Sequence, residues 1–355
     1  MSKILVLATS RKSHGGISSV VMAHERGAQW KDMDCHWVVT HRSGSTWVKL
    51  WYLMRGMVSF LMRVPFCKLV HIHTSEPPSA KRKQMFMRIA KALGKKVIVH
   101  FHAFDTESTI KSGAQDVYRY LFESADVVIA LSPTWKRAIN EVFDLGEKVQ
   151  VLYNPCSSKS LSVEEFKGLS VTKKKQILSA GVVNARKGYK DLIRGFAEIA
   201  DRHKDWKVVF AGSGEIEEGK ALAKELGIEQ QVGFLGWVAG EEKDKVFRET
   251  SIFCLPSYAE GFPMAVLDAW AYGLPVVATP VGGLPDIVKD GEDCLLFEPG
   301  DCKRLGEQLE RMITDEELRE RIEGASRNFA EKVFNEDVID RQLGEMYSEL
   351  LRQKQ

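Results

Sequence analysis

The sequence predicts an α/β protein of two doubly wound domains, in each of which helices cover both faces of a parallel sheet. Short apolar runs rich in β-branched residues alternate with helical patterns along the chain. The alternation stops at a polar segment near the middle and then restarts. With 355 residues, the chain is too long for one ordinary compact domain and comfortable for two. Because such a sheet binds its ligand at the carboxyl ends of its strands, we expect the functional residues there.

The first domain, residues 1–157, is expected to hold six strands separated by helices. The strands are Ile4–Ala8, His36–Thr40, Leu69–His73, Val97–His100, Val127–Leu131 and Val149–Leu152. The helical patterns between them include Ser18–Trp30, Ser79–Leu93 and Val117–Glu123. The strands read as nearly continuous apolar runs, which is typical of a parallel sheet buried on both faces.

A polar segment follows Asn154-Pro155, and we expect a linker at residues 158–175. The second domain, residues 176–336, repeats the pattern of the first. Its expected strands are Ile177–Ala180, Val208–Ala211, Val232–Leu235, Ile252–Leu255, Val276–Ala278 and Leu295–Phe297. Its expected helices are Tyr189–Arg202, Glu217–Leu226, Glu242–Thr250, Met264–Tyr272 and Lys303–Thr314, and the last helix of the chain is Asp337–Leu351.

The composition excludes several classes of protein. The chain is 44% hydrophobic and 28% charged, which is typical of a soluble globular protein. Lys or Arg interrupts every apolar run before the roughly 18–20 residues that cross a bilayer. The six cysteines form no C-x-x-C pair, which favours reduced thiols in a cytosolic compartment. Secreted proteins, integral membrane proteins and zinc ribbons are therefore not expected.

A net charge of +2 hides a marked asymmetry along the chain. Residues 1–157 carry 22 Lys and Arg against 12 Asp and Glu, whereas the remainder carries 28 against 36. The stretch 35–104 contains 12 basic residues and a single acid, Glu76, and eight of the nine histidines lie in the first half. We expect the basic half to attract an anionic partner: a nucleotide, a nucleic acid or a lipid surface.

Aromatic, methionine and basic residues are concentrated within residues 47–96. The segment Trp47–Phe66 is followed by the basic helix Ser79–Lys96. One interpretation is a basic amphipathic surface that docks on anionic headgroups. The other is that the apolar residues face the core and the cations are solvated. The sequence leaves both open, and a nucleic-acid role is disfavoured because no recognised module is present.

The strongest motif lies between Pro256 and Ala278, where a strand is followed by an acidic loop, a helix and a second strand. Glu260 lies in the loop at the carboxyl end of the strand Ile252–Leu255, and Asp268 lies on the helix that follows. Carboxylates in this position accept hydrogen bonds from sugar or ribose hydroxyls. Alternatively, Glu260 caps the helix and Asp268 is a solvated helical residue.

This segment resembles the E-x7-E signature of glycosyltransferase family 4, a retaining family with the GT-B fold. Three further segments resemble that family in the same order: Val209–Glu215, Val232–Gly236 and Val276–Asp286. The resemblance covers nearly all of residues 176–350. It implies two facing Rossmann-like domains with a cleft between them, and a C-terminal helix, residues 337–355, that crosses back onto the N-terminal domain.

In the family, a Lys and an Arg hold the diphosphate of the donor. Lys187 corresponds to that Lys, and we expect it to carry most of the leaving-group stabilisation. Val182 stands where the family has its Arg, and Arg186 is the candidate replacement. The resemblance assigns Asp268 to the ribose and Glu260 to the transferred sugar. The expected donor-binding residues are Gly15, Gly16, Arg186, Gly212, Gly261, Phe262, Pro263 and Asp268.

Two histidine-bearing strands of the first half also resemble the family. His102 follows the second of them and aligns with the family histidine that contacts the transferred sugar, so the expected catalytic residues are Glu260, Lys187 and His102. We expect His73 and His14 on the acceptor side, and His71 and His100 in the core. A glycine pair, Gly15-Gly16, opens the first helix and lets a phosphate approach the backbone.

We expect neither a cofactor nor a metal. The histidine pairs do not form a complete tetrahedral ligand set with an acidic or Cys residue, and Asp32-Met33-Asp34 is expected in a solvated turn rather than at a sheet end. The resemblance implies transfer of a hexose or N-acetylhexosamine from a nucleotide-diphosphate sugar, expected to be a UDP-sugar, to a glycan or lipid-linked acceptor in surface polysaccharide synthesis such as lipopolysaccharide or capsule. The expected location is cytoplasmic or peripheral on the inner face of the plasma membrane. The alternatives are a sugar-nucleotide epimerase and a catalytically weak nucleotide-sugar-binding subunit.

Overall fold

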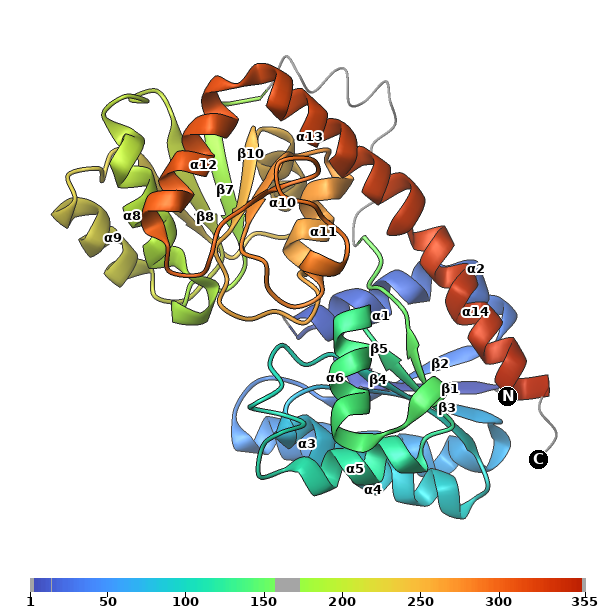
Figure 1. Cartoon of the computed structure of the whole chain (residues 1–355). Coiled ribbons are helices and arrows are strands. Elements are labelled where there is room, and N and C mark those ends of the chain that lie inside the picture. The colour runs from blue at the N-terminus through green and yellow to red at the C-terminus, as the bar shows by residue number, and fades with distance from the viewer. Residues whose placement is uncertain (1–2, 14, 157–172, 353–355) are drawn as a thin grey trace. The chain divides into compact units, whose positions relative to one another are not determined.

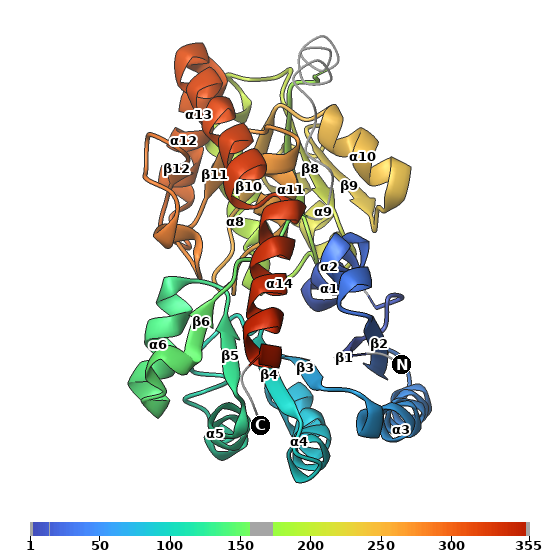
Figure 2. The same cartoon turned by 90° about the vertical axis from the view of Figure 1, so that its right-hand side faces the viewer.

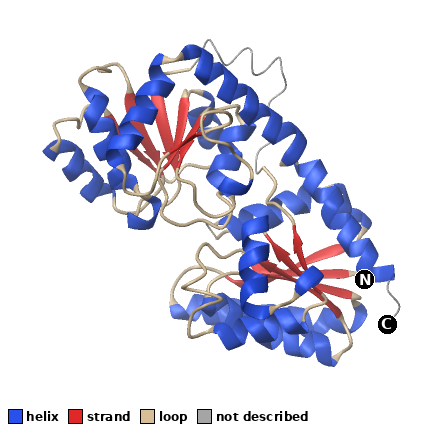
Figure 3. Ribbon diagram, viewed as in Figure 1, coloured by secondary structure: helices blue, strands red, loops and turns tan. Residues whose placement is uncertain are grey.

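The computed structural model describes residues 3–13, 15–156 and 173–352. The chain divides into two compact units: a first unit of Met1–Ser157 with Glu336–Gln355, and a second unit of Ser158–Asn335. Each unit contains a sheet with helices packed on its faces (Figure 3). The linker expected at 158–175 lies mostly outside the described residues.

The first unit is built on a six-stranded parallel sheet with the order β2-β1-β3-β4-β5-β6 (Figure 1). The strands are β1 (Ile4–Thr9), β2 (Cys35–His41), β3 (Leu69–Thr74), β4 (Lys96–Phe101), β5 (Val127–Ala130) and β6 (Val149–Val151). The helices are α1 (Gly16–Arg26), α2 (Ala28–Asp32), α3 (Thr46–Arg63), α4 (Pro77–Ala92), α5 (Gln115–Ser124) and α6 (Pro133–Phe143).

The last helix, α14 (Glu336–Arg352), packs on the sheet of the first unit. Its apolar side chains Ile339, Leu343, Tyr347 and Leu350 belong to the same buried cluster as β1, β3 and β4. Figure 2 shows α14 running along this sheet. The expectation that the C-terminal helix returns to the N-terminal domain is confirmed.

The second unit repeats the design with a six-stranded parallel sheet of order β12-β11-β10-β7-β8-β9. The strands are β7 (Gln176–Ala180), β8 (Lys207–Ala211), β9 (Val232–Gly236), β10 (Ile252–Leu255), β11 (Val276–Ala278) and β12 (Leu295–Leu296). The helices are α8 (Tyr189–Ala200), α9 (Ile216–Glu225), α10 (Gly240–Arg248), α11 (Met264–Ala271), α12 (Cys302–Thr314) and α13 (Glu316–Asn328). A buried cluster joins α8 and α12 to the sheet.

All twelve expected strands are present, because buried parallel strands need uninterrupted apolar runs that are easy to recognise. The expected helix Ser18–Trp30 is wrong in one respect: the structure divides it into α1 and α2 at Gly27, whose ψ of 157° is extended. The carboxylate of Asp340 on α14 fills the space that a Cβ at Gly27 would need. It also accepts a hydrogen bond from the N–H of Gln29 at 3.2 Å, so a distant helix caps α2.

Among the described residues, no helix combines the length and the apolarity that crossing a membrane requires.

Candidate functional site

Each sheet has one point at which the chain reverses its direction of winding. In the second unit the chain runs outward from β7 through β8 to β9 and then returns to β10 on the other side of β7. In the first unit the corresponding neighbours are β1 and β3. Ligands of doubly wound sheets bind outside the carboxyl ends of the strands at such a point. The segments after β7, β10, β1 and β3 are therefore where site residues are expected.

In the second unit, two cations and one carboxylate meet at this point. Arg186 and Lys187 lie in the short turn after β7, and Glu260 lies in the loop after β10. The ammonium of Lys187 forms an ion pair with Oε1 of Glu260, which is almost fully buried. The guanidinium of Arg186 lies 3.7 Å from the same oxygen and donates to the carbonyl of Ala259 at 2.5 Å. These three side chains together carry one positive charge, which suits an anionic ligand.

The local backbone explains why Lys187 stands where it does. The side chain of Asn184 accepts a hydrogen bond from the N–H of Lys187 at 3.1 Å and caps the turn Ala185–Lys187. Gly188 ends that turn with a φ of 66° and begins α8. A left-handed residue here favours glycine, and the sequence supplies one. The strand, the capped turn and the glycine thus fix the base of the Lys187 side chain.

Arg186 is the candidate replacement for the Arg that the resembled family has at the position of Val182. Val182, at the position where the resembled family has Arg, is 46% exposed and carries no charge. The guanidinium of Arg186 turns toward the loop of Glu260 and Ala259. Two cations are therefore present beside Glu260, although the second comes from a different position of the chain.

Glu260 and Asp268 are not the helix cap and the solvated residue that formed the alternative interpretation. α11 begins without any side-chain cap, and Glu260 pairs with Lys187 instead. Asp268 is buried on α11, and its Oδ2 accepts from the ammonium of Lys243 on α10 at 2.7 Å. Both carboxylates are thus held by lysines, and Lys243 is a partner that the sequence analysis did not identify.

Gly261, Phe262 and Pro263 are buried between these two acids. The ring of Phe262 packs against Phe334 with centroids 5.3 Å apart, so it faces the core of the unit. The carbonyl of Gly261 accepts from the N–H of Gly283 at 2.9 Å. In the glycine pair Gly282-Gly283, the N–H of Gly283 is therefore already engaged and ties two loops together.

Gly212 follows β8 and is required by close packing. A Cβ at this position would overlap the carbonyl oxygen of Gly181, which follows the neighbouring strand β7. Gly212 therefore allows the carboxyl ends of β7 and β8 to approach each other. Its role in the structure is to shape the strand ends.

In the first unit, Gly15 and Gly16 begin α1 after β1. No described side chain caps this end of α1, so its first N–H groups are available to solvent or to a ligand. A Cβ at Gly15 would meet nothing within 4 Å, which shows open space around the backbone. The hydroxyl of Ser18 donates to the carbonyl of Gly15 at 2.9 Å and closes the loop. His14 lies outside the described residues.

A column of histidines follows β3 and β4 on the face covered by α14. His71 and His73 lie on β3, and His100 and His102 lie at the end of β4, with His73 directly paired to His100 in the sheet register. Nδ1 of His71 is 2.6 Å from the hydroxyl of Tyr347. Neighbouring imidazole rings are stacked or tilted, with centroids 4.1–5.5 Å apart, and Tyr347 meets His71 edge-to-face with centroids 5.7 Å apart. His71 and His100 are buried as expected.

His73 is a correction to the sequence analysis, which expected it to face a cleft. It is fully buried, and its Nδ1 lies 2.9 Å from Nε2 of His102. The partly buried His102 is the member of the column that the structure leaves accessible. His73 supports the ring of His102 and does not itself face solvent. The physical reason is that β3 is central in the sheet and covered on both faces.

Burial keeps these imidazoles uncharged. It lowers the pKa of His102 to about 3 and that of His24, on α1, to about 4. It also places the pKa values of His71, His73 and His100 well below the ordinary value, and neighbouring imidazoles add to the effect. At neutral pH the column is a set of neutral hydrogen-bonding groups.

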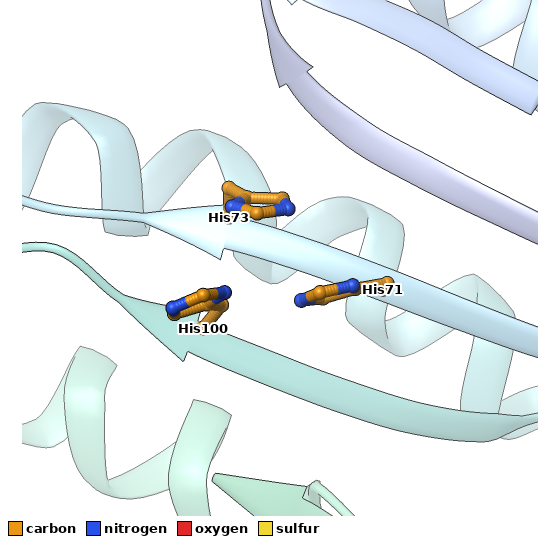
Figure 4. Close-up of side chains that lie close together, drawn as sticks. All are labelled: His71, His73 and His100. Atoms are coloured by element: carbon orange, nitrogen blue, oxygen red, sulfur yellow. The ribbon is translucent and has the colours of Figure 1, made fainter. Parts of the chain in front are cut away.

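Among the described residues, His71, His73 and His100 are the group that a metal ion would find (Figure 4). One nitrogen of each lies within 4.8 Å of the others, and neutral imidazole is the form that binds metals. Nε2 of His71, Nε2 of His73 and both nitrogens of His100 have no hydrogen-bond partner. The histidines stand at alternate positions of two strands, and this period of two was the signal that the sequence analysis did not use.

The turn Asp32-Met33-Asp34 is not part of this group. Asp32 ends α2, and both aspartates are exposed before β2. Their position agrees with a solvated turn.

Comparison with known proteins agrees with this architecture. The model of "Glycosyltransferase Family 4" matches residues 13–158, and that of "Glycosyl transferases group 1" matches residues 162–329. The crystal structure of Anabaena Alr3699/HepE in complex with UDP-glucose superposes with a TM-score of 0.77 at 20% identity, covering 98% of this chain and 99% of that chain. The two doubly wound sheets thus define a GT-B fold.

Two curated relatives extend the comparison. An uncharacterized glycosyltransferase of Methanocaldococcus jannaschii is 30% identical over 241 residues, which are 65% of this chain and 61% of the relative. N-acetyl-alpha-D-glucosaminyl L-malate synthase of Bacillus anthracis is 25% identical over 292 residues, 80% of this chain and 75% of the relative. The chain thus spans less than two thirds of the archaeal relative. Since the two family models together match both units, the chain belongs to the group 1, family 4 glycosyltransferases.

Proposed function

We propose that the chain is a retaining glycosyltransferase that moves a hexose or an N-acetylhexosamine from a UDP-sugar to a glycan or lipid-linked acceptor in the synthesis of a surface polysaccharide. The observation that carries the proposal is the cluster of Lys187, Arg186 and Glu260 beside the switch point of the second sheet. Its net positive charge suits a diphosphate, and its carboxylate suits sugar hydroxyls.

The choice of donor is supported by what the similar proteins bind. The Anabaena structure contains UDP-glucose, and the Bacillus relative is named for an N-acetylglucosaminyl product. Both point to the same class of donor, a nucleotide-diphosphate hexose. The ribose is assigned to Asp268, whose second oxygen is held in place by Lys243.

The proposed reaction breaks the bond between C1 of the sugar and the β-phosphate oxygen, and forms a bond from C1 to the acceptor oxygen on the same face. The acceptor proton passes to the departing phosphate. Negative charge grows on the leaving UDP, and the ammonium of Lys187 and the guanidinium of Arg186 offset it. Because Glu260 and Asn184 already hold Lys187, little reorganisation is needed when charge develops.

The first unit supplies neutral groups to this reaction. His102 offers an imidazole nitrogen that hydrogen bonds to a sugar hydroxyl, and its low pKa of about 3 keeps it uncharged at neutral pH. The uncapped start of α1 at Gly15 and Gly16 offers backbone N–H groups to a phosphate oxygen. The groups assigned to the first unit are thus neutral hydrogen-bonding groups.

We further propose that transfer needs no divalent ion, because two cationic side chains already stand where the leaving phosphates are assigned. Turnover after dialysis against EDTA should equal turnover with added magnesium or manganese. Loss of turnover on chelation, restored by one added ion, would contradict metal-independent transfer. His71, His73 and His100 would then be the first candidate ligands to test.

The direct test is mass-spectrometric detection of sugar transfer. Purified full-length chain is incubated with UDP-glucose, UDP-galactose or UDP-N-acetylglucosamine, with and without a bacterial lipid extract. We expect a glycosylated product and UDP only when donor and acceptor are both present. Release of a changed sugar nucleotide without acceptor would identify an epimerase instead. Saturable donor binding with no product would identify the binding subunit that the uncharged Val182 keeps as an alternative.

A further inference from the structure

Helix α3 is anchored to the first unit through one narrow face. A Cβ at Gly56 would overlap the carbonyl oxygen of Val39, so α3 lies directly against the edge strand β2. The ring of Phe60 is fully buried and meets Phe86 of α4 edge-to-face with centroids 5.2 Å apart. The side chain of Ser45 caps the first turn. The orientation of α3 about its own axis is therefore fixed by packing.

The opposite face of α3 is apolar as well, and it is exposed. Its side chains recur at intervals of three and four residues, which places them on one stripe of the helix. This outer stripe consists of Trp47, Trp51, Met54, Val58, Leu61 and Met62. Exposure within it ranges from 47% at Leu61 to 81% at Trp47. Leu50 and Phe66, both exposed, extend the patch at its side and its end.

A helix that is apolar on two opposite faces is normally buried on both. Single exposed apolar residues are common, but a continuous stripe of two tryptophans, two methionines and two aliphatic residues marks an interaction surface. Figures 1 and 2 show α3 at the outside of the first unit, where no other described helix covers it. The outer stripe therefore has no partner among the described helices of the first unit.

The charge around the outer stripe indicates what that partner is. Arg55 is exposed on α3, Lys68 is exposed just before β3, and Lys81 is exposed on α4, the helix whose Phe86 packs on Phe60 of α3. None of these three cations forms an ion pair with a described residue. Glu76 is the single acid in residues 35–104. A second copy of the same face would bring cations against cations, whereas an anionic bilayer complements both the apolar stripe and its cationic surroundings.

We propose that α3 is a membrane-docking helix that lies in the interface of an anionic phospholipid bilayer, with the aliphatic and methionine side chains of its outer stripe among the acyl chains. Trp47 and Trp51 sit at the level of the headgroups, where amphipathic rings are favoured. Arg55 and the neighbouring lysines contact the lipid phosphates. Docking goes beyond sugar transfer and does not depend on it, although it favours an acceptor that is itself carried by a lipid.

Vesicle co-sedimentation of the full chain tests the proposal. The protein is mixed with phosphatidylcholine vesicles that contain or lack phosphatidylglycerol, at low salt. We expect sedimentation with the anionic vesicles and weaker partitioning with the neutral ones. Tryptophan fluorescence should be quenched by brominated acyl chains, because Trp47 and Trp51 enter the interface. Sugar transfer to a water-soluble acceptor should proceed without vesicles, so the two proposals fail separately.

Two variants separate the apolar and electrostatic contributions. Trp51→Gln/Met62→Gln should lower partitioning into anionic vesicles about tenfold or more, because it removes two large apolar side chains from the stripe. Arg55→Gln/Lys68→Gln should lower it several-fold and reduce its dependence on salt. The matched control is Leu226→Gln/Leu235→Gln, which changes two exposed apolar residues of the second unit and should leave partitioning unchanged.

Three results would overturn the proposal. The first is no sedimentation of the folded wild-type chain with anionic vesicles. The second is sedimentation that the stripe variant does not weaken. The third is a dimer in analytical ultracentrifugation that Trp51→Gln/Met62→Gln abolishes, since the stripe would then join two copies of the chain. Circular dichroism of each variant confirms that the fold is retained.

Discussion

Both units are built on a six-stranded parallel sheet, but they differ in strand order and treat the buried polar groups near their switch points in opposite ways. In the second unit the groups are charged and paired, Lys187 with Glu260 and Lys243 with Asp268. In the first unit they are histidines whose charged form burial disfavours. Eight of the nine histidines of the chain belong to the first unit. The buried groups near the switch point are thus paired charges in the second unit and neutral imidazoles in the first.

This difference teaches that the parallel sheet sets only the positions at which chemistry is placed. The strands end at corresponding points in both units, and the residues that follow them decide what is bound. A capped turn carries the cations in the second unit, and a pair of histidine strands carries the imidazoles in the first. Substitutions in either unit can test this difference.

The largest expected effect is a loss of kcat when a charged residue of the second unit is replaced. Lys187→Ala removes the ammonium assigned to the leaving phosphate, and we expect kcat to fall by about 100- to 1000-fold. Lys175→Ala is the matched control, because its ion pair with Asp205 is exposed and it precedes β7, whereas Lys187 follows the other end of that strand. Steady-state kinetics with thermal denaturation separates catalysis from folding. If the variant retains most of its kcat, Lys187 has no catalytic role.

The next largest effect is the dependence of stability on pH, which the buried neutral histidines of the first unit cause. The folded state keeps His24 and His102 uncharged down to pH values of about 4 and 3, whereas the unfolded chain protonates them near pH 6.5. The unfolded state therefore binds more protons below pH 6.5, and stability falls as the pH falls. Each buried histidine should cost about 2 kcal/mol at pH 5. Asp340, 4.0 Å from His24, has a raised pKa and offsets part of this loss.

Hydrogen exchange followed by mass spectrometry measures this pH effect in each unit. Peptides of the first unit should lose protection between pH 7 and pH 5 more than peptides of the second, which contains only His203. Equal loss in both units would show that the histidine column does not govern the acid response.

A smaller effect distinguishes the two glycine loops. Gly212→Ala should destabilise the second unit by about 1–3 kcal/mol, because the new Cβ overlaps the carbonyl oxygen of Gly181. Gly15→Ala should change stability by less than about 0.5 kcal/mol, because open space surrounds that backbone. Urea denaturation measures both. A raised KM for the donor in a fully stable Gly15→Ala protein would show that the space admits a phosphate, and an unchanged KM would exclude that role.

The smallest effect is expected at the second carboxylate. Asp268→Asn keeps the shape of the side chain but removes its charge, and the KM for the UDP-sugar should rise about threefold to tenfold with little change in kcat. Asp205→Asn, on the surface of the same unit, is the control. If donor KM stays the same while stability falls, Asp268 serves only to hold Lys243.

Much of the fold follows from local pattern. The strands were predictable because a buried parallel strand is an apolar run of a few residues between polar segments. α3 was described from the sequence only as an apolar and basic segment. Its apolar residues occur on both sides of the helix, so the usual contrast between a polar and an apolar face is absent. The helix break at Gly27 depends on Asp340, more than 300 residues away in the chain.

The candidate site was partly predictable for a similar reason. Glu260, Asp268 and Lys187 could be placed at strand ends because a strand and its loop are continuous in sequence. The partners of these residues could not be predicted, since Lys243 comes from another helix and Arg186 reaches Glu260 across two loops. The burial of His73 was also missed, because a strand end looks the same in sequence whether or not a helix covers it.

The sequence by itself determined the two wound sheets, the order of their strands along the chain and the chemical types of residue at their ends. They follow from the pattern of apolar and polar residues, which is visible in short stretches of the sequence. Only the tertiary structure decided which charges neutralise one another, which imidazoles lie in the core and which face of α3 the first unit leaves uncovered. Those outcomes depend on contacts between segments that are far apart in the sequence. A side chain becomes buried or ion-paired only when these segments pack together.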